Sequence, residues 1–88
     1  MKQERWNTVP KREQLLHMGA AILRAASFQK SDPKKFFASL REAEQLLLLS
    51  IADPKWSGNP WLPRFHAELN EFARGERTDS IKILYEAL

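Results

Sequence analysis

Few side chains in this sequence could do acid–base or metal chemistry. Only two histidines occur, His17 and His66, and neither lies at a spacing that metal or catalytic motifs use. The 88 residues contain no cysteine, which excludes disulfides, thiolate metal sites and cysteine nucleophiles. Glycine-rich phosphate loops, Gly-x-Ser-x-Gly elbows and His-Glu-x-x-His patterns are also missing. We therefore expect no enzyme activity, no cofactor and no bound metal.

Glu44 is the most unusual ionisable residue, because it falls inside the apolar arc of a predicted helix, between Phe37 and Leu48. A carboxylate buried there must be paired or protonated. Its functional roles would be a general acid or base, a metal ligand, or a polar device that sets helix register in an oligomer. The alternative that we favour is a carboxylate near the edge of the core, because a lone glutamate seldom makes a site. It would then reach solvent or pair with Arg24, Arg41 or Lys82.

Positive charge is concentrated in the first half of the chain. Residues 1–41 carry nine Lys or Arg against three acidic residues, whereas residues 42–88 carry five against eight. A basic half of this kind could face phosphate, an anionic lipid surface or an acidic protein. The alternatives that we favour are a solvated face that keeps the protein soluble, or charge complementarity between the two halves of one fold. The candidate nucleic-acid contacts are Lys11, Arg12, Lys34 and Lys35.

Two tryptophans are candidates for contact with a protein partner. Tryptophan is enriched at interface hot spots, because its ring buries much area at a low entropic cost. Trp56 lies in a loop of turn residues, and Trp6 lies in the N-terminal arm, so these two rings are our candidates for exposed contacts. The alternative for Trp56 is that its ring packs over the end of the bundle, against the side of the second helix that carries Leu46 and Leu49.

Proline, glycine and capping residues divide the chain into four segments with the apolar periodicity of helices. We predict helices over residues 10–28 and 33–52, a third that opens at 59–63 and ends near 74, and a short fourth capped by Thr78. Residues 1–8 form an arm, and residues 53–63 form a loop rich in proline and tryptophan. Because no strand pattern competes, the prediction is an all-α single domain over residues 1–88. It is a small antiparallel helical bundle of three longer helices plus a short C-terminal helix.

The second predicted helix is apolar on two sides. Its main apolar face comprises Phe36, Phe37, Leu40, Ala43, Leu47, Leu48 and Ile51. Leu46 and Leu49 project from the opposite side, so the last two turns are apolar nearly all round. Such a surface needs cover from another element or another chain. We expect Leu46 and Leu49 to form a protein interface.

These features favour a small non-enzymatic protein-interaction module, an adaptor or regulator that self-associates through the leucine-rich second helix or binds another protein. A nucleic-acid-binding protein that uses the basic N-terminal half is the alternative. No apolar run is longer than Leu46 to Leu49, whereas a bilayer span needs ~20 residues, so no membrane partner is expected. The lack of cysteine fits a reducing compartment, and we expect a cytoplasmic location.

Overall fold

The chain folds into helices joined by short connections. The computed structural model describes residues 2–88, and no strand occurs among them. The elements are α1 (Gln3–Asn7), α2 (Lys11–Phe28), α3 (Pro33–Ile51), the 3-10 turn η1 (Pro54–Trp56), α4 (Trp61–Ala73) and α5 (Lys82–Glu86). The predicted all-α fold, with three longer helices, is confirmed.

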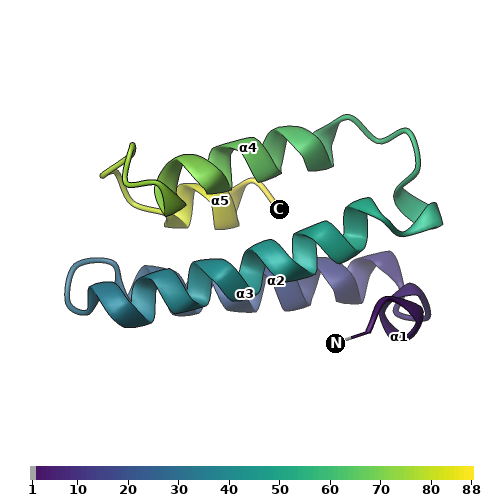
Figure 1. The fold of residues 1–88 in the computed structure, drawn as a ribbon, viewed down its shortest axis with the longest axis horizontal. Coiled ribbons are helices and arrows are strands. Elements are labelled where there is room, and N and C mark those ends of the chain that lie inside the picture. Colours follow the sequence, from purple (N-terminus) through teal and green to yellow (C-terminus); the bar gives the residue numbers. More distant parts are fainter. Residues whose placement is uncertain (1) are drawn as a thin grey trace.

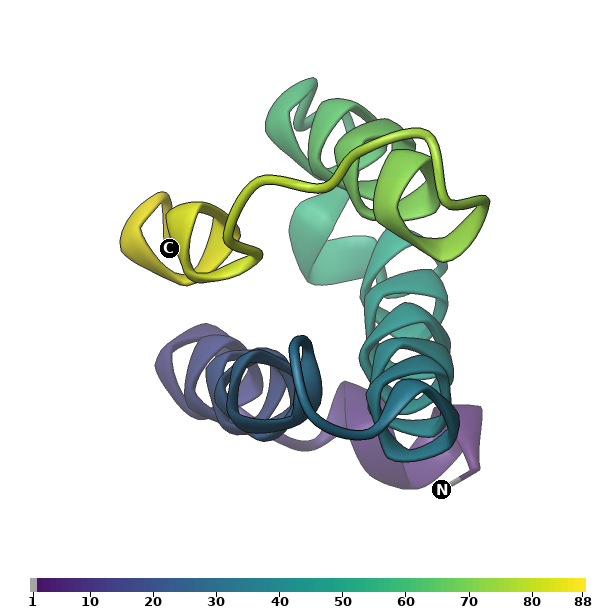
Figure 2. The same cartoon turned by 90° about the vertical axis from the view of Figure 1, so that its left-hand side faces the viewer.

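The helices α2 to α5 run alternately up and down, as short connections between neighbouring helices require (Figure 1). Seen end-on, α3 packs between α2 and α4, while α5 lies over α2 and beside α4 (Figure 2). The short helix α1 crosses one end of the α2–α3 hairpin and packs against α3 (Figure 1). The core lies inside this ring, and its largest fully buried side chains include Phe72, Met18, Ile22, Leu40 and Leu69.

Local signals in the sequence set several helix ends. The Asp32 carboxylate accepts from the backbone N–H of Lys35 at 3.2 Å, and Pro33 follows at the first position of α3. Gly75 has a φ of 74° just after α4, in the left-handed region that glycine adopts without strain. The expected start of the second helix and the expected end of the third are therefore confirmed.

The last helix begins later than predicted, and Thr78 does not cap it. The Gln29 side chain accepts from the Ile81 N–H at 2.8 Å and donates to the Asp79 carbonyl oxygen at 2.7 Å. These two hydrogen bonds hold residues 79–81 against the end of α2, so helical turns start only at Lys82. A long-range side-chain contact overrides the local capping signal here.

The segment predicted as an N-terminal arm contains α1. The Thr8 hydroxyl donates to the Arg5 carbonyl oxygen at the end of α1. Pro10 is the residue before α2, and no side chain caps the start of this helix. Residues 3–7 are therefore part of the packed structure.

Gly19 allows α5 to approach α2 closely. A Cβ atom at this position would lie 3.2 Å from Cε2 of Tyr85 and 3.3 Å from Cδ1 of Leu88. We expect Gly19→Leu to lower the free energy of unfolding by about 1–3 kcal/mol, because the added side chain would push α5 away from α2. Thermal unfolding measures the effect, with Ala20→Leu on the exposed neighbouring position as the control. An unchanged Gly19→Leu melting temperature would mean that α5 does not need this close approach.

Candidate protein-interaction surface

Trp6 and Trp56 are buried, so the prediction that they are exposed contacts is wrong. Trp6 has no exposed surface, and only 8% of Trp56 is exposed. The Trp6 indole N–H donates to Ser50 Oγ at 3.0 Å, and the Trp56 indole N–H donates to Gln14 Oε1 at 2.6 Å. Both rings are buried because α1 folds back on α3, and because η1 packs on α3 with Trp56 against Gln14 of α2. The indole N–H groups then find acceptors inside the fold.

A buried polar network joins these tryptophans. The Gln14 amide donates from Nε2 to the Trp6 carbonyl oxygen at 3.0 Å and to Asp53 Oδ2 at 2.8 Å. Asp53 also accepts from Lys55 Nζ at 2.8 Å and from the Lys55 backbone N–H at 2.9 Å. Sequence reasoning missed this network. Gln14, a polar residue on the buried face of α2, is the signal that could have found it.

The ionisation of Asp53 follows from its surroundings. Burial by itself raises the pKa of the Asp53 carboxyl, because a charged group loses its hydration. Hydrogen bonds from Lys55 and Gln14, together with the Lys55 charge, outweigh burial and lower the pKa below the ordinary 3.8. Both carboxylate oxygens are occupied by donors from the protein. We conclude that this ionised group stabilises the junction of α1, α2 and η1.

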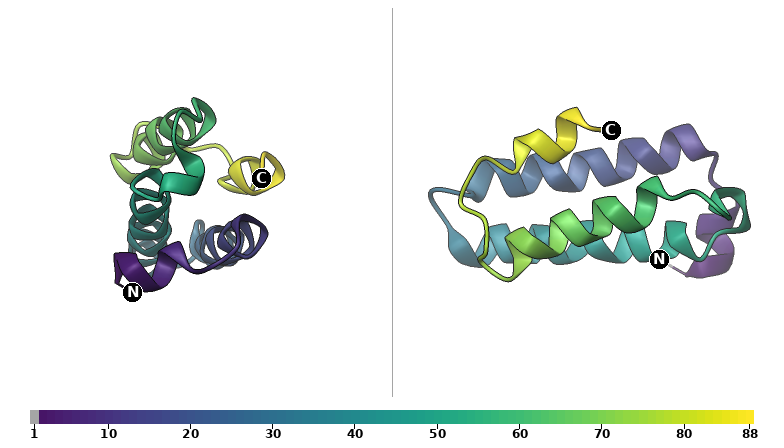
Figure 3. Two further views of the ribbon diagram at one scale, coloured as in Figure 1. Left: turned by 90° about the vertical axis from the view of Figure 1, so that its right-hand side faces the viewer. Right: turned by 90° about the horizontal axis from the view of Figure 1, so that it is seen from above.

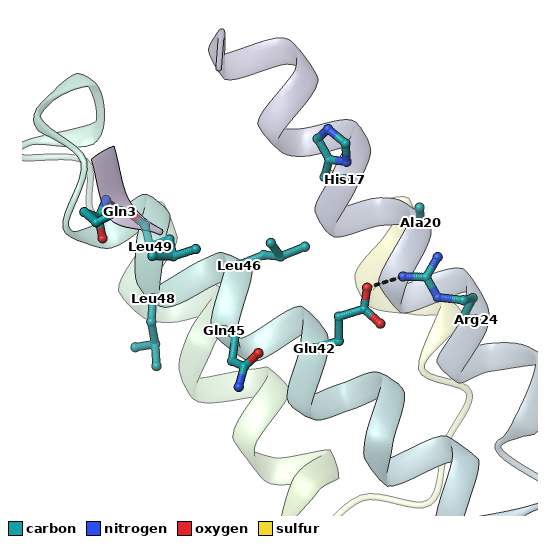
Figure 4. A pocket seen from close by; sticks show the side chains of 9 residues that line it. All are labelled: Gln3, His17, Ala20, Arg24, Glu42, Gln45, Leu46, Leu48 and Leu49. Atoms are coloured by element: carbon teal, nitrogen blue, oxygen red, sulfur yellow. Dashed lines mark hydrogen bonds and ion pairs between the residues drawn. The ribbon is translucent and has the colours of Figure 1, made fainter. Parts of the chain in front are cut away.

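Leu46 and Leu49 are partly covered within the chain. Leu46 is half-buried against the core, and the Leu49 carbonyl oxygen accepts from the Gln3 side chain of α1 at 2.8 Å. Both leucines line an open groove of about 690 Å³ between α2 and α3. Arg24 and Glu42 form an ion pair across this groove (Figure 4). The helices α1 and α2 therefore supply part of the cover that was expected from another element or another chain.

Three large apolar side chains of α3 that the sequence assigns to the core are exposed. The exposed fractions are 40% for Phe37, 46% for Leu48 and 38% for Ile51. The buried face of α3 comprises Phe36, Ser39, Leu40, Ala43, Leu47 and Ser50. The predicted apolar arc is wider than the neighbouring helices can cover, so its edge stays in solvent.

Glu44 lies on this open edge, so the burial that its place in the apolar arc suggested is not found. Its side chain is 35% exposed, and Oε2 lies 3.2 Å from Nε2 of His66 on α4. Asn70 Nδ2 lies 3.4 Å from the same histidine nitrogen. The favoured alternative, a carboxylate at the edge of the core, matches this position. Its partner is a histidine instead of one of the three cations that the sequence suggested.

Five residues share this open edge of α3. We call Phe37, Arg41, Glu44, Leu48 and Ile51 together the α3 stripe.

The four basic residues considered for nucleic-acid contact do not form one patch. Lys11 and Arg12 begin α2, whereas Lys34 and Lys35 lie at the start of α3. Because the two helices are antiparallel, the pairs lie at opposite ends of a molecule 36 Å long (Figure 3). Lys11 Nζ also lies 4.9 Å from the centre of the Trp56 ring, so the ammonium group makes a cation–π contact within the molecule.

Other features of the structure add little about function. Within residues 2–88, no group of three or more histidine, aspartate and glutamate side chains is placed to hold a metal ion. None of the described helices combines the length and apolar character needed to cross a membrane. Comparisons with protein-family models, curated proteins and solved structures find no match. Function must therefore be inferred from the exposed surfaces of this chain.

Proposed function

We propose that this protein is a small non-enzymatic interaction module that self-associates through α3. The α3 stripe supports this proposal, because it places three exposed large apolar side chains along one flank of a 19-residue helix. The helices α2 and α4 pack against α3 (Figure 2) but leave these three side chains 38–46% exposed. Large apolar side chains that stay exposed on one side of a helix mark a candidate protein interface.

A second exposed apolar area lies between α2 and α5. Leu16, Leu23 and Tyr85 are exposed there beside a groove of about 490 Å³. One wall of this groove belongs to a five-residue helix near the end of the chain. We favour the α3 stripe, because a long helix packed on both sides holds its side chains in a more fixed arrangement.

Sedimentation velocity at micromolar concentration tests the proposal. The wild-type protein is expected to form a species heavier than the 10.2 kDa chain. Leu48→Glu is expected to weaken association about tenfold or more, because it buries an unpaired charge in the interface. Leu16→Glu, a matched change at an exposed leucine of α2, is the control and should associate like the wild type.

The outcomes separate the candidate surfaces. A wild-type protein that stays monomeric throughout the micromolar range would contradict self-association. Loss of association in Leu16→Glu but not in Leu48→Glu would move the interface to the area between α2 and α5. Leu49 lies in the groove between α2 and α3 but outside the α3 stripe, whereas Leu48 belongs to both. We therefore expect the effect of Leu49→Glu to be smaller than that of Leu48→Glu.

A further inference from the structure

The α3 stripe has the spacing of a helix-pairing seam. Its members follow one another at intervals of four, three, four and three residues, as the a and d positions of a heptad do. Arg41 and Glu44 occupy the middle of the seam, with apolar residues towards both ends. An apolar seam with central charges of opposite sign can specify how two copies of the helix align.

Resting on the proposed self-association, we propose that α3 pairs antiparallel with α3 of a second copy about a two-fold axis, with Arg41 of each copy opposite Glu44 of the other. In such a pair each a position faces a d position, and a two-fold axis makes every contact occur twice. The axis would pass between Glu42 and Ala43, close to the middle of α3. Phe37 of each copy would then face Leu48 of the other.

The charges of the central residues support this partner. Arg41 is exposed and forms no ion pair with any described residue. Glu44 is partly exposed, and within the chain its Oε2 lies 3.2 Å from Nε2 of His66. A second copy in this register supplies each arginine with a carboxylate and each carboxylate with a guanidinium. Two ion pairs would therefore form at the centre of the interface, where they are most shielded from water.

The remaining pairs fit the same alignment. Lys34 would lie opposite Ile51 at each end, where the lysine stem can cover the isoleucine while its ammonium stays in water. A shallow groove of about 340 Å³ between α3 and α4 borders the stripe at Phe37, Arg41 and Glu44. Side chains of the second copy can enter this groove without displacing α4.

A parallel alignment of the same stripe is disfavoured. It would place Arg41 against Arg41 and Glu44 against Glu44, so that like charges meet twice at the centre. Like-charge contacts in an interface oppose binding of that alignment. Charge therefore selects the antiparallel alignment.

Charge exchange between two variants tests this geometry. Arg41→Glu and Glu44→Arg, each alone, should associate about tenfold or more weakly than the wild type in sedimentation velocity. An equimolar mixture of the two should regain association, because one chain then carries two acids and the other two arginines. The double variant Arg41→Glu/Glu44→Arg keeps the wild-type net charge and should self-associate like the wild type.

Folding controls accompany these measurements, because Glu44 contacts His66. Circular dichroism melts should show that each variant remains helical. Glu44→Gln, a neutral residue of similar size that can still hydrogen-bond, should weaken association less than Glu44→Arg. It replaces Glu44→Arg in the comparison with the wild type if the arginine variant fails to fold.

The outcomes distinguish this geometry from self-association in general. If the wild type associates while the charge variants match it, the antiparallel pairing is overturned and the proposed function stands. If single exchanges weaken association but neither the mixture nor the double variant restores it, the pairing is overturned as well. A monomeric wild type would overturn both proposals.

Discussion

Replacing Trp6 with alanine is expected to lower the free energy of unfolding by about 3–5 kcal/mol. Trp6 is the largest fully buried side chain, so its removal leaves a cavity and exposes apolar surface. The Ser50 hydroxyl loses the indole donor but still donates to the Leu46 carbonyl oxygen at 2.9 Å, so most of the cost is lost packing. Small domains have total stabilities of only about 5–15 kcal/mol. The loss would therefore lower the melting temperature by more than about 10 °C.

Two control variants define what this experiment measures. Arg5→Ala changes an exposed neighbour on α1 and should leave the melting temperature nearly unchanged. Trp6→Phe keeps an aromatic ring but lacks the indole N–H, so it should fall between the wild type and Trp6→Ala. If Trp6→Ala melts within a few degrees of the wild type, α1 is not part of the cooperatively folded unit. A five-residue helix is too short to persist alone, so it would then be unfolded.

Asp53→Asn is expected to lower the free energy of unfolding by about 2–3 kcal/mol at neutral pH. The amide replaces one accepting oxygen with a donor, which would face the N–H groups of Gln14 or Lys55. Urea denaturation of the wild type and the variant measures the difference. The control variant is Asp79→Asn. A hydrogen bond from Arg77 also lowers the pKa of Asp79, but this carboxylate is exposed. Its effect should be small, because exposed ion pairs contribute little.

The Asp53 difference should depend on pH in one direction. Because folding lowers the pKa of Asp53, the carboxylate contributes its full stabilisation above the ordinary pKa of 3.8, which the unfolded chain has. That contribution is lost as the pH falls through the lower pKa of the folded state. The gap between wild type and Asp53→Asn should be constant from about pH 5 to 8 and shrink below about pH 4. A gap that widened towards acid pH would show instead that burial outweighs the hydrogen bonds and raises this pKa.

Helix boundaries could be predicted where the signal is local. Asp32 and Pro33 start α3, and Gly75 follows the end of α4, because capping and left-handed backbone depend on adjacent residues. The start of α5 could not be predicted this way, because it depends on Gln29, which lies 52 residues from Ile81 in the sequence. The packing of α1 (residues 3–7) likewise depends on long-range hydrogen bonds, because Trp6 donates to Ser50 and accepts from Gln14.

The amino-acid sequence by itself determined that this chain is all-helical, where its three long helices lie and that α3 carries more apolar surface than one face can bury. Periodicity and local hydrogen bonding are sufficient for that much. Only the tertiary structure decided which apolar side chains of α3 are covered: it partly covers Leu46 and leaves Phe37 and Leu48 exposed. A helix with a wide apolar arc can rotate about its axis with little local cost. Its neighbours α2 and α4 therefore select which edge remains in solvent.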